Sequence, residues 1–190
     1  RTRSLEMVLH EMREQSRRYG TSDFLFLDLK LNSNPHLLRG LVENVQTAVP
    51  GAQWIGTVHV DLRKDNGLSR TELRAAASAG MRRVSFGLES GSQRLLDLMD
   101  KGAAVDANEA FIRHSSEAGI SVRCTMFKGF PGETADDLEQ TADFLLRNTP
   151  HIDRVRFNDF SILEDTPIWN SIMAGGDAYP DIRMTGVDDA

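Results

Sequence analysis

A glutamate and a serine lie between two glycines in the stretch SFGLESGSQRLLDLMDKG, residues 85–102, where the pattern of an apolar strand changes into that of a helix. Packing alone gives no reason for a carboxylate at such a place. A carboxylate that is buried without a partner destabilises a fold, so Glu89 is expected to meet a ligand amine, a ribose hydroxyl or a nearby arginine. The stretch therefore predicts part of a ligand-binding site around Glu89 and Ser90.

A second unusual stretch, FKGFPGETADDLEQT, covers residues 127–141. Gly129, Pro131 and Gly132 predict a tight turn, and Thr134 is placed to cap the helix that follows. Glycines let a backbone approach a ligand closely, which favours a second part of the same site. An ordinary turn between a strand and a helix needs the same residues, and the residues alone favour neither interpretation.

Polar or small side chains gather at the expected carboxyl ends of several strands. Ligands bind at this end of the sheet in parallel α/β folds. For any single residue, an ordinary strand-end side chain that reaches solvent is an equal alternative, whereas the set as a whole favours a site. The residues concerned are Asp28, His59, Asp61, Gly87, Glu89 and Asn158.

Five apolar segments of strand length, each followed by a helical pattern, are expected to position these residues. The strands are predicted over residues 23–29, 53–61, 82–89, 120–127 and 153–162, and Ser4, Asn34, Ser69, Thr134 and Pro167 are predicted to begin helices. A spacing of about 30 residues is typical of βαβ units. The sequence predicts an α/β fold with a parallel sheet, open or closed into a barrel, over residues 1–174, and a loosely ordered tail over residues 175–190.

The composition excludes several classes of protein. The 190 residues carry a net charge of −6 that is spread along the chain, which argues against a general nucleic-acid surface. No apolar run approaches the roughly 20 residues of a membrane span, and no leader pattern is present, so a cytoplasmic protein is expected. The helical pattern begins almost at Arg1, which favours a piece of a longer protein.

A single cysteine limits the redox and metal chemistry of the chain. Cys124 excludes an internal disulfide, and one thiol cannot hold an iron-sulfur cluster, which needs several cysteine ligands. Cys124 is expected to pack as a small apolar residue.

Together, the two stretches resemble the radical S-adenosylmethionine superfamily, in the branch shared by cobalamin-binding and methylthiotransferase-type enzymes. The specific combination is GLESGSQRLLDLMDKG followed by GFPGET about forty positions later. The segments RTRSLEMVLHEM, FLFLDLKLN, HVDLRKD and FNDFSILEDTPIW extend the resemblance to about Ile172.

This resemblance implies a partial (βα) barrel, of which the chain would supply strands two to six of six. It also implies S-adenosylmethionine bound beside a [4Fe-4S] cluster, whose three cysteine ligands belong to a CxxxCxxC loop outside this chain. Enzymes of the family cleave the cofactor reductively to a 5'-deoxyadenosyl radical, and some transfer methyl groups through cobalamin. FLFLDLKLN and VRFNDFSILEDTPIW favour the cobalamin branch, and no metal ligand is predicted within the chain.

Roles follow from the resemblance position by position. Glu89 and Ser90 would hold polar groups of S-adenosylmethionine, with Gly87 leaving room for it. Arg123 would pair with the cofactor carboxylate if its side chain faces inward, a side for which Cys124 and Met126 compete. The implied cofactor-binding residues are Gly87, Glu89, Ser90, Arg123, Gly129, Pro131, Gly132 and Asn158.

Three further residues lie where substrate-facing groups are expected, and they are Asp28, His59 and Asp61. For His59, a histidine with satisfied hydrogen bonds at a strand end is an equally good interpretation.

Three functions are open at this point. The first is the larger part of a radical enzyme core, inactive by itself and prone to self-association through the edge of its first strand. The second is a cluster-less barrel that binds a nucleotide-like ligand or acts as a scaffold. The third is an unrelated βα-barrel enzyme that uses Glu89 as acid or base, for which the sequence offers no triad, metal-ligand cluster or Walker loop. The substrate, whether small or macromolecular, is not identified.

Overall fold

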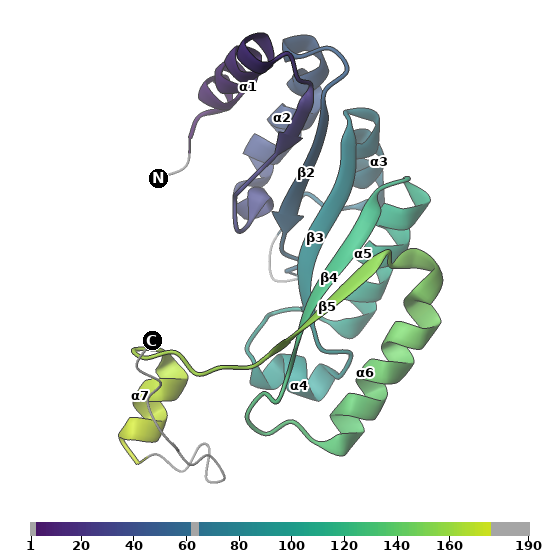
Figure 1. The fold of residues 1–190 in the computed structure, drawn as a ribbon. Coiled ribbons are helices and arrows are strands. Elements are labelled where there is room, and N and C mark those ends of the chain that lie inside the picture. Colours follow the sequence, from purple (N-terminus) through teal and green to yellow (C-terminus); the bar gives the residue numbers. More distant parts are fainter. Residues whose placement is uncertain (1–2, 62–64, 176–190) are drawn as a thin grey trace.

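Residues 3–61 and 65–175 are described by a computed structural model, in which five strands form one curled sheet (Figure 1). The strands lie in the order β1-β2-β3-β4-β5, and each pairs in parallel with the next. The predicted α/β half-barrel of parallel strands is confirmed. The strands are β1 (Asp23–Leu25), β2 (Gln53–Val58), β3 (Met81–Glu89), β4 (Ser121–Lys128) and β5 (Arg154–Asp159).

Helices α2, α3, α5 and α6 lie along one face of this sheet (Figure 1). Ser4 and Asn34 cap α1 and α2 with their side chains, and Ser69 and Thr134 open α3 and α6 with capping boxes, as the sequence predicts. The helices are α1 (Leu5–Tyr19), α2 (Pro35–Ala48), α3 (Arg70–Ser78), α4 (Gln93–Leu98), α5 (Val105–Glu117), α6 (Ala135–Asn148) and α7 (Pro167–Met173), with 3-10 helices η1 (Leu31–Ser33) and η2 (Thr149–His151).

Alternation along the strands divides their side chains between two faces. On β3, Val84, Phe86 and Leu88 are buried beneath the helices, while Ser85 and Gly87 face the opposite side and are partly exposed. The opposite side is the open, concave face of the half-barrel, and the predicted site residues are expected to meet where the strands have their carboxyl ends.

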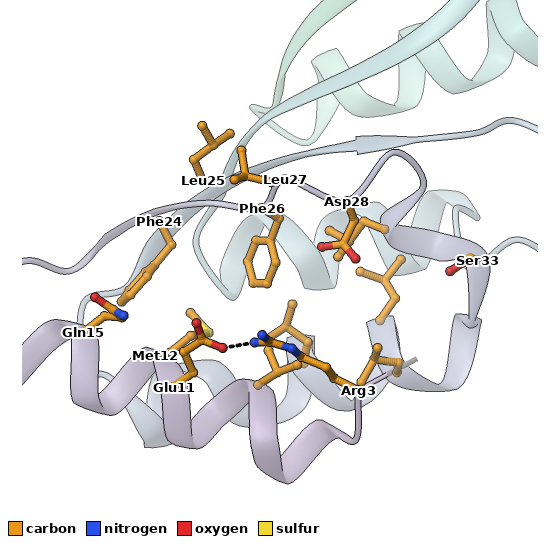
Figure 2. Close-up of a pocket in the computed structure, with 15 residues that line it drawn as sticks. Arg3, Glu11, Met12, Gln15, Phe24, Leu25, Phe26, Leu27, Asp28 and Ser33 are labelled. Carbon is orange, nitrogen blue, oxygen red and sulfur yellow. Dashed lines mark hydrogen bonds and ion pairs between the residues drawn. The ribbon is translucent and has the colours of Figure 1, made fainter. Parts of the chain in front are cut away.

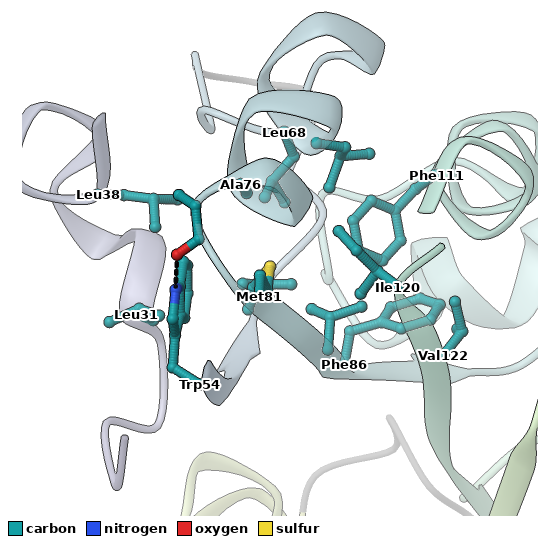
Figure 3. Packing of buried hydrophobic residues seen from close by; sticks show 14 of the residues in the cluster. Leu31, Leu38, Trp54, Leu68, Ala76, Met81, Phe86, Phe111, Ile120 and Val122 are labelled. Atoms are coloured by element: carbon teal, nitrogen blue, oxygen red, sulfur yellow. Dashed lines mark hydrogen bonds between the residues drawn. The ribbon is translucent and has the colours of Figure 1, made fainter. Parts of the chain in front are cut away.

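The helix-covered face holds the apolar core (Figure 3). Phe86 and Phe111 meet edge to face with their ring centroids 5.0 Å apart, and the indole Nε1 of Trp54 donates to the Ala79 carbonyl at 3.0 Å. Cys124 is fully buried in this core, which confirms the expectation that it packs as an apolar residue. Burial raises the pKa of its thiol to about 12.

The first strand is shorter than the sequence predicts and lies at the edge of the sheet. The apolar pattern continues to Leu29, yet β1 ends at Leu25, and Leu27 and Leu29 are 84% and 94% exposed. Among the strands that the structure describes, β1 pairs only with β2. An edge of this kind keeps unpaired N–H and C=O groups that can pair with another strand.

The second strand also ends earlier than predicted, at Val58 instead of Asp61. The buried side chain of Asn32 takes over the backbone hydrogen bonds at this point. Its Oδ1 accepts from the His59 N–H at 3.0 Å, and its Nδ2 donates to the His59 carbonyl at 2.9 Å. An amide side chain that satisfies both backbone groups removes the need for a neighbouring strand.

The carboxyl-terminal part of the described chain leaves the sheet. Pro167 begins α7, as predicted, and α7 stands apart from the strands in Figure 1. The predicted tail falls almost entirely on residues 176–190, which lie outside the described residues. Over residues 3–61 and 65–175, no helix is both long and apolar enough to cross a membrane.

Candidate functional site

Glu89 ends β3 in a backbone conformation that residues other than glycine rarely adopt. Its φ is 63°, and the pairing of β3 with β4 shifts register between Gly87 and Glu89. This irregularity turns the glutamate out of the strand's regular alternation. The residue is 7% exposed, so the conformation keeps a carboxylate beneath the surface at the carboxyl end of the sheet.

The two carboxylate oxygens of Glu89 have different surroundings. Oε1 lies 3.0 Å from the Nζ of Lys101 and forms an ion pair with it. Oε2 is buried and has no hydrogen-bond partner among the residues that the structure describes. A buried acceptor without a donor is unfavourable, so Oε2 offers a position for an amine or a hydroxyl of a ligand.

Gly87 makes room for the glutamate itself. A Cβ atom at this position would lie 2.2 Å from Glu89 Oε1. The resemblance implies space for the ligand beside Gly87, whereas the structure fills that space with the carboxylate. Gly87 therefore controls where the carboxylate sits.

The residues after Glu89 attach this turn to helix α6. Ser90 is 1% exposed, and its hydroxyl lies 3.0 Å from that of Thr141. The N–H of Gly91 donates to the same Thr141 hydroxyl at 3.0 Å. Because the Ser90 hydroxyl is already bonded to α6, its side chain supports the turn, and the ligand-binding role that the resemblance implies for it stays a prediction.

Asp137 joins the two unusual stretches. It is fully buried in α6 and accepts hydrogen bonds from Ser92 at 2.6 Å and from the Thr134 hydroxyl at 2.6 Å. Arg94 forms an ion pair with Asp137 and donates to the Gly132 carbonyl at 2.7 Å. The hydrogen bond from Arg94, followed by those from Ser92 and Thr134, outweighs burial and holds the pKa of Asp137 well below its usual range.

The turn between β4 and α6 has the backbone conformation that its glycines predict. Gly129 and Gly132 have φ values of 77° and 83°, which favour glycine. The Gly129 N–H donates to the Glu133 carboxylate at 2.6 Å, and Pro131 is buried. These are turn-forming features, and the predicted contact of Gly129, Pro131 and Gly132 with a ligand stays a prediction.

The side on which Arg123 lies is decided by strand register. Arg123 pairs with Ser85, so both face the concave side, while Cys124 and Met126 are buried on the helix side. Glu89 pairs with Met126, three residues farther along β4, which places Arg123 about 10 Å below the level of the glutamate. Arg123 is therefore on the inward face that pairing with the cofactor carboxylate requires, but it lies nearer the amino ends of the strands than Glu89 does.

Asn158 lies beside the turn between β4 and α6. It pairs with Phe127 on the neighbouring strand, and its Oδ1 accepts from the Nε of Arg156 at 3.1 Å. Its amide Nδ2 makes no hydrogen bond in the described part of the chain. Asn158 is thus close to the second stretch, and its implied contact with the cofactor stays a prediction.

His59 and Asp61 follow the end of β2, and His59 lies near Lys101. The backbone of Lys101 lies close enough to the His59 ring to raise its pKa slightly, and the Lys101 side chain contacts Glu89. Burial, reinforced by the charge of Lys30, lowers the pKa of His59, and the charge of Asp61 opposes that shift. The imidazole is thereby biased toward its neutral form.

Asp28 is the third residue that was expected to face the substrate. It lines a cavity of about 680 Å³ between α1, the β1 segment and α2 (Figure 2). Figure 2 shows Leu25 and Leu27 pointing away from α1, while Phe24 and Phe26 extend toward it. Asp28 shares the cavity with these two phenylalanines, and its expected role as a substrate-facing residue stays a prediction.

Sequence inspection missed two residues that shape the site, Lys101 and Asn32. Lys101 belongs to the quoted stretch but lies twelve positions after Glu89, beyond the reach of strand or helix periodicity. A lysine before a glycine at the end of a helix gives only weak evidence for a contact with a distant carboxylate. Asn32 had no signal, since its partners are backbone groups.

The available donors and acceptors suit an organic ligand. Within residues 3–61 and 65–175, no three His, Cys, Asp or Glu side chains group to hold a metal ion. The unpaired Glu89 Oε2 requires a hydrogen-bond donor, which an amino acid ammonium or a ribose hydroxyl provides. The residues fit S-adenosylmethionine, and they do not fit the ligand set of an iron-sulfur cluster.

Comparison with known proteins identifies relatives over most of the chain. The model of the radical SAM superfamily matches residues 1–145. A methyltransferase of uncharacterized function from Pyrococcus horikoshii is 24% identical over 174 residues, which are 92% of this chain and 36% of that protein. The ribosomal protein uS12 methylthiotransferase RimO of Citrobacter koseri is 36% identical over 96 residues, or 50% of this chain and 20% of that enzyme.

Solved structures give the same fold. The radical S-adenosylmethionine methyltransferase TsrM of Kitasatospora setae, solved with cobalamin and a [4Fe-4S] cluster, superposes with a TM-score of 0.75 at 21% identity, over 92% of this chain and 34% of that one. The cobalamin-dependent radical enzyme OxsB superposes with a TM-score of 0.65 at 16% identity, over 93% of this chain and 26% of that one. The chain spans about a third of the length of the relatives that it matches most fully.

Proposed function

The chain belongs to the radical SAM superfamily, and from this premise we propose that its whole protein binds S-adenosylmethionine beside a [4Fe-4S] cluster for radical or methyl-transfer chemistry. When bound to a reduced cluster, the cofactor supplies an adenosyl radical or a methyl group. The only cysteine of the chain is buried in the core, so the proposed cluster ligands are cysteines outside it. A cluster-less scaffold is not favoured by these relatives.

A single observation carries this proposal: the unpaired Glu89 Oε2 at the carboxyl end of the sheet. There the glutamate would accept a hydrogen bond from the amino group or a ribose hydroxyl of S-adenosylmethionine. Ser90 and Gly91 hold the backbone of this turn against α6 through hydrogen bonds to Thr141. The contribution of this chain is therefore to bind and orient the cofactor.

Other residues are proposed to complete the cofactor pocket. The turn of residues 129–132 and Asn158 would lie beside the adenine, and their neighbouring positions on β4 and β5 support this role. Arg123 on the concave face would reach the cofactor carboxylate only if its side chain extends toward the carboxyl end of β4. His59 and Asp61 would face the substrate, with the histidine in its neutral form.

Several partners and settings are part of the proposal. The free edge of β1 would pair with the strand that carries the cluster loop, and in its absence self-association through that edge is expected. Cobalamin is a proposed second cofactor, because TsrM and OxsB, which share the fold, bind it. A cytoplasmic location is proposed because the free thiol of Cys124 and an iron-sulfur cluster both suit a reducing compartment.

The proposal is tested by iron and acid-labile sulfide analysis of the full-length protein, purified without oxygen, together with S-adenosylmethionine cleavage after reduction. We expect about four irons per chain, as a [4Fe-4S] cluster requires, and release of 5'-deoxyadenosine or a demethylated cofactor. Absence of both iron and cleavage would reject the proposed activity.

Glu89→Gln is expected to weaken S-adenosylmethionine binding by about 1 to 3 kcal/mol, which is about 5-fold to 150-fold in Kd. The amide lacks the charge that pairs with Lys101 and offers a poorer acceptor to the ligand. Equilibrium dialysis with the full-length protein measures the change. Glu139→Gln, on the exposed face of α6, is the matched control and should leave Kd unchanged.

Gly87→Ala is expected to weaken cofactor binding by about 10-fold with little change in stability. The added methyl group would meet only the end of the flexible Glu89 side chain, which can move away. That movement displaces the carboxylate from the cofactor. Dialysis and thermal unfolding of the same sample separate the two effects, and a large loss of stability with unchanged affinity would contradict this account.

A further inference from the structure

Lys101 lies in the segment that connects α4 to α5 and reaches the end of β3. Its side chain is 34% exposed, whereas that of Glu89 is 9% exposed. The ion pair therefore joins a carboxylate beneath the surface to a lysine that closes over it. None of the roles inferred from the resemblance involves this lysine.

The backbone around Lys101 is shaped to bring it there. Asp100 and Gly102 have φ values of 50° and 61°, so left-handed conformations stand on both sides of the lysine. The Lys101 N–H donates to the Leu96 carbonyl at 3.2 Å, which ends α4 with a tight turn. A non-glycine residue in the left-handed region is unfavourable by itself, so the surrounding structure holds this turn in place.

The same lysine contacts both parts of the candidate site. Its Nζ lies 3.0 Å from Glu89 Oε1, and its backbone lies close enough to His59 to influence the pKa of the imidazole. The segment thus links the proposed cofactor-binding carboxylate to the proposed substrate-facing histidine. A lysine that served only to hold the connection between α4 and α5 would not need to contact Glu89 at the end of β3.

We propose that Lys101 is a positioning residue that occupies one oxygen of Glu89 and so orients the other oxygen toward S-adenosylmethionine. This inference rests on the proposed function. The lysine neutralises a buried charge that would otherwise oppose burial, and it leaves Oε2 as the acceptor that remains for the ligand. Its effect on the cofactor is exerted through Glu89.

The test is the Kd of S-adenosylmethionine, measured by equilibrium dialysis with the full-length, cluster-containing protein. Lys101→Met should raise Kd by about 10-fold to 100-fold, since the glutamate loses the partner that holds it. Lys101→Arg, which retains a charged donor, should bind within about 3-fold of the wild type. Arg17→Met removes the exposed ion pair with Glu14 on α1 and is the control, with no expected change in Kd.

A double-mutant cycle separates positioning from a purely structural role. If Lys101 acts through Glu89, adding Lys101→Met to Glu89→Gln should change Kd by less than about 3-fold beyond Glu89→Gln alone. Independent, multiplying effects would overturn the inference, as would normal binding by Lys101→Met. Thermal unfolding is recorded for each variant, and Lys101→Gln replaces the methionine variant in the cycle if the latter does not fold.

The outcomes also distinguish the two proposals. If the wild type does not bind S-adenosylmethionine, the proposed function is rejected and the role of Lys101 is rejected with it. If the wild type binds and Lys101→Met binds equally well, only the role of Lys101 is rejected.

Discussion

Replacing Asp137 by alanine is expected to lower the free energy of unfolding by about 3 kcal/mol. The carboxylate is fully buried, so its removal leaves the buried Ser92 hydroxyl without its acceptor and removes the capping-box partner of Thr134. The ion pair with Arg94 contributes less, because the arginine side chain is 53% exposed. Urea denaturation measures the change.

The neighbouring residue provides the control for this substitution. Asp136→Ala removes a carboxylate that is exposed and bonded only to Gln140, one turn along the same helix, so a change within about 0.5 kcal/mol is expected. Equal effects of the two substitutions would show that the buried network at Asp137 contributes no more than a surface carboxylate.

The same network predicts how stability depends on pH. The pKa of Asp137 lies well below its usual range in the folded protein, chiefly because of the hydrogen bond from Arg94. A depressed pKa stabilises the fold at pH values above the unfolded-state pKa of about 3.9, and that stabilisation is lost as pH falls toward the folded-state pKa. The loss in free energy of unfolding caused by Asp137→Ala should therefore be largest near neutral pH and should become smaller below about pH 4.

Gly91→Ala is expected to destabilise the fold by about 3 kcal/mol and to weaken cofactor binding in the same protein. A Cβ at this position would lie 2.6 Å from the Phe144 Cβ and 2.8 Å from the Thr141 Cα. These atoms belong to the α6 backbone or lie next to it, so the helix itself must shift. Because that shift separates α6 from the turn at Ser90, the position of Glu89 should change as well.

Gly40→Ala is the matched control for Gly91→Ala. The added Cβ would also meet an atom at 2.6 Å, but that atom is the end of the flexible Leu5 side chain. Alanine is favoured over glycine inside a helix, so Gly40→Ala is expected to be nearly neutral. Chemical denaturation and S-adenosylmethionine dialysis of both variants measure these effects. If Gly91→Ala were as neutral as Gly40→Ala, the proposed close packing of α6 against Gly91 would be contradicted.

Much of the fold could be predicted from sequence because its signals are local. Alternating apolar residues indicate the strands, and Ser4, Asn34, Ser69 and Thr134 cap helices with their own neighbours. Such interactions depend on residues only a few positions apart, and periodicity reports them directly. The ends of β1, β2 and β5 differed from the prediction, because a strand's length depends on the partners that its backbone finds elsewhere.

The candidate site was predicted only in part. Glu89 was identified because a carboxylate in an apolar strand has no packing role, and the structure gives it the expected burial. Its surroundings were not predicted. Ser90 turned out to bond Thr141, and Asp28 lies in a separate cavity, since each depends on which element packs beside it.

The sequence by itself determined the order of strands and helices, the family resemblance and the presence of one carboxylate that needs a partner. Only the tertiary structure decided that Lys101 meets Glu89, that Asp137 joins Ser92 to Thr134, and which face Arg123 occupies. Ser92 and Asp137 are 45 positions apart, and no periodic pattern relates them. Strand register and the packing of α6 against the β3 turn bring these side chains within hydrogen-bonding distance, and both are properties of the assembled sheet.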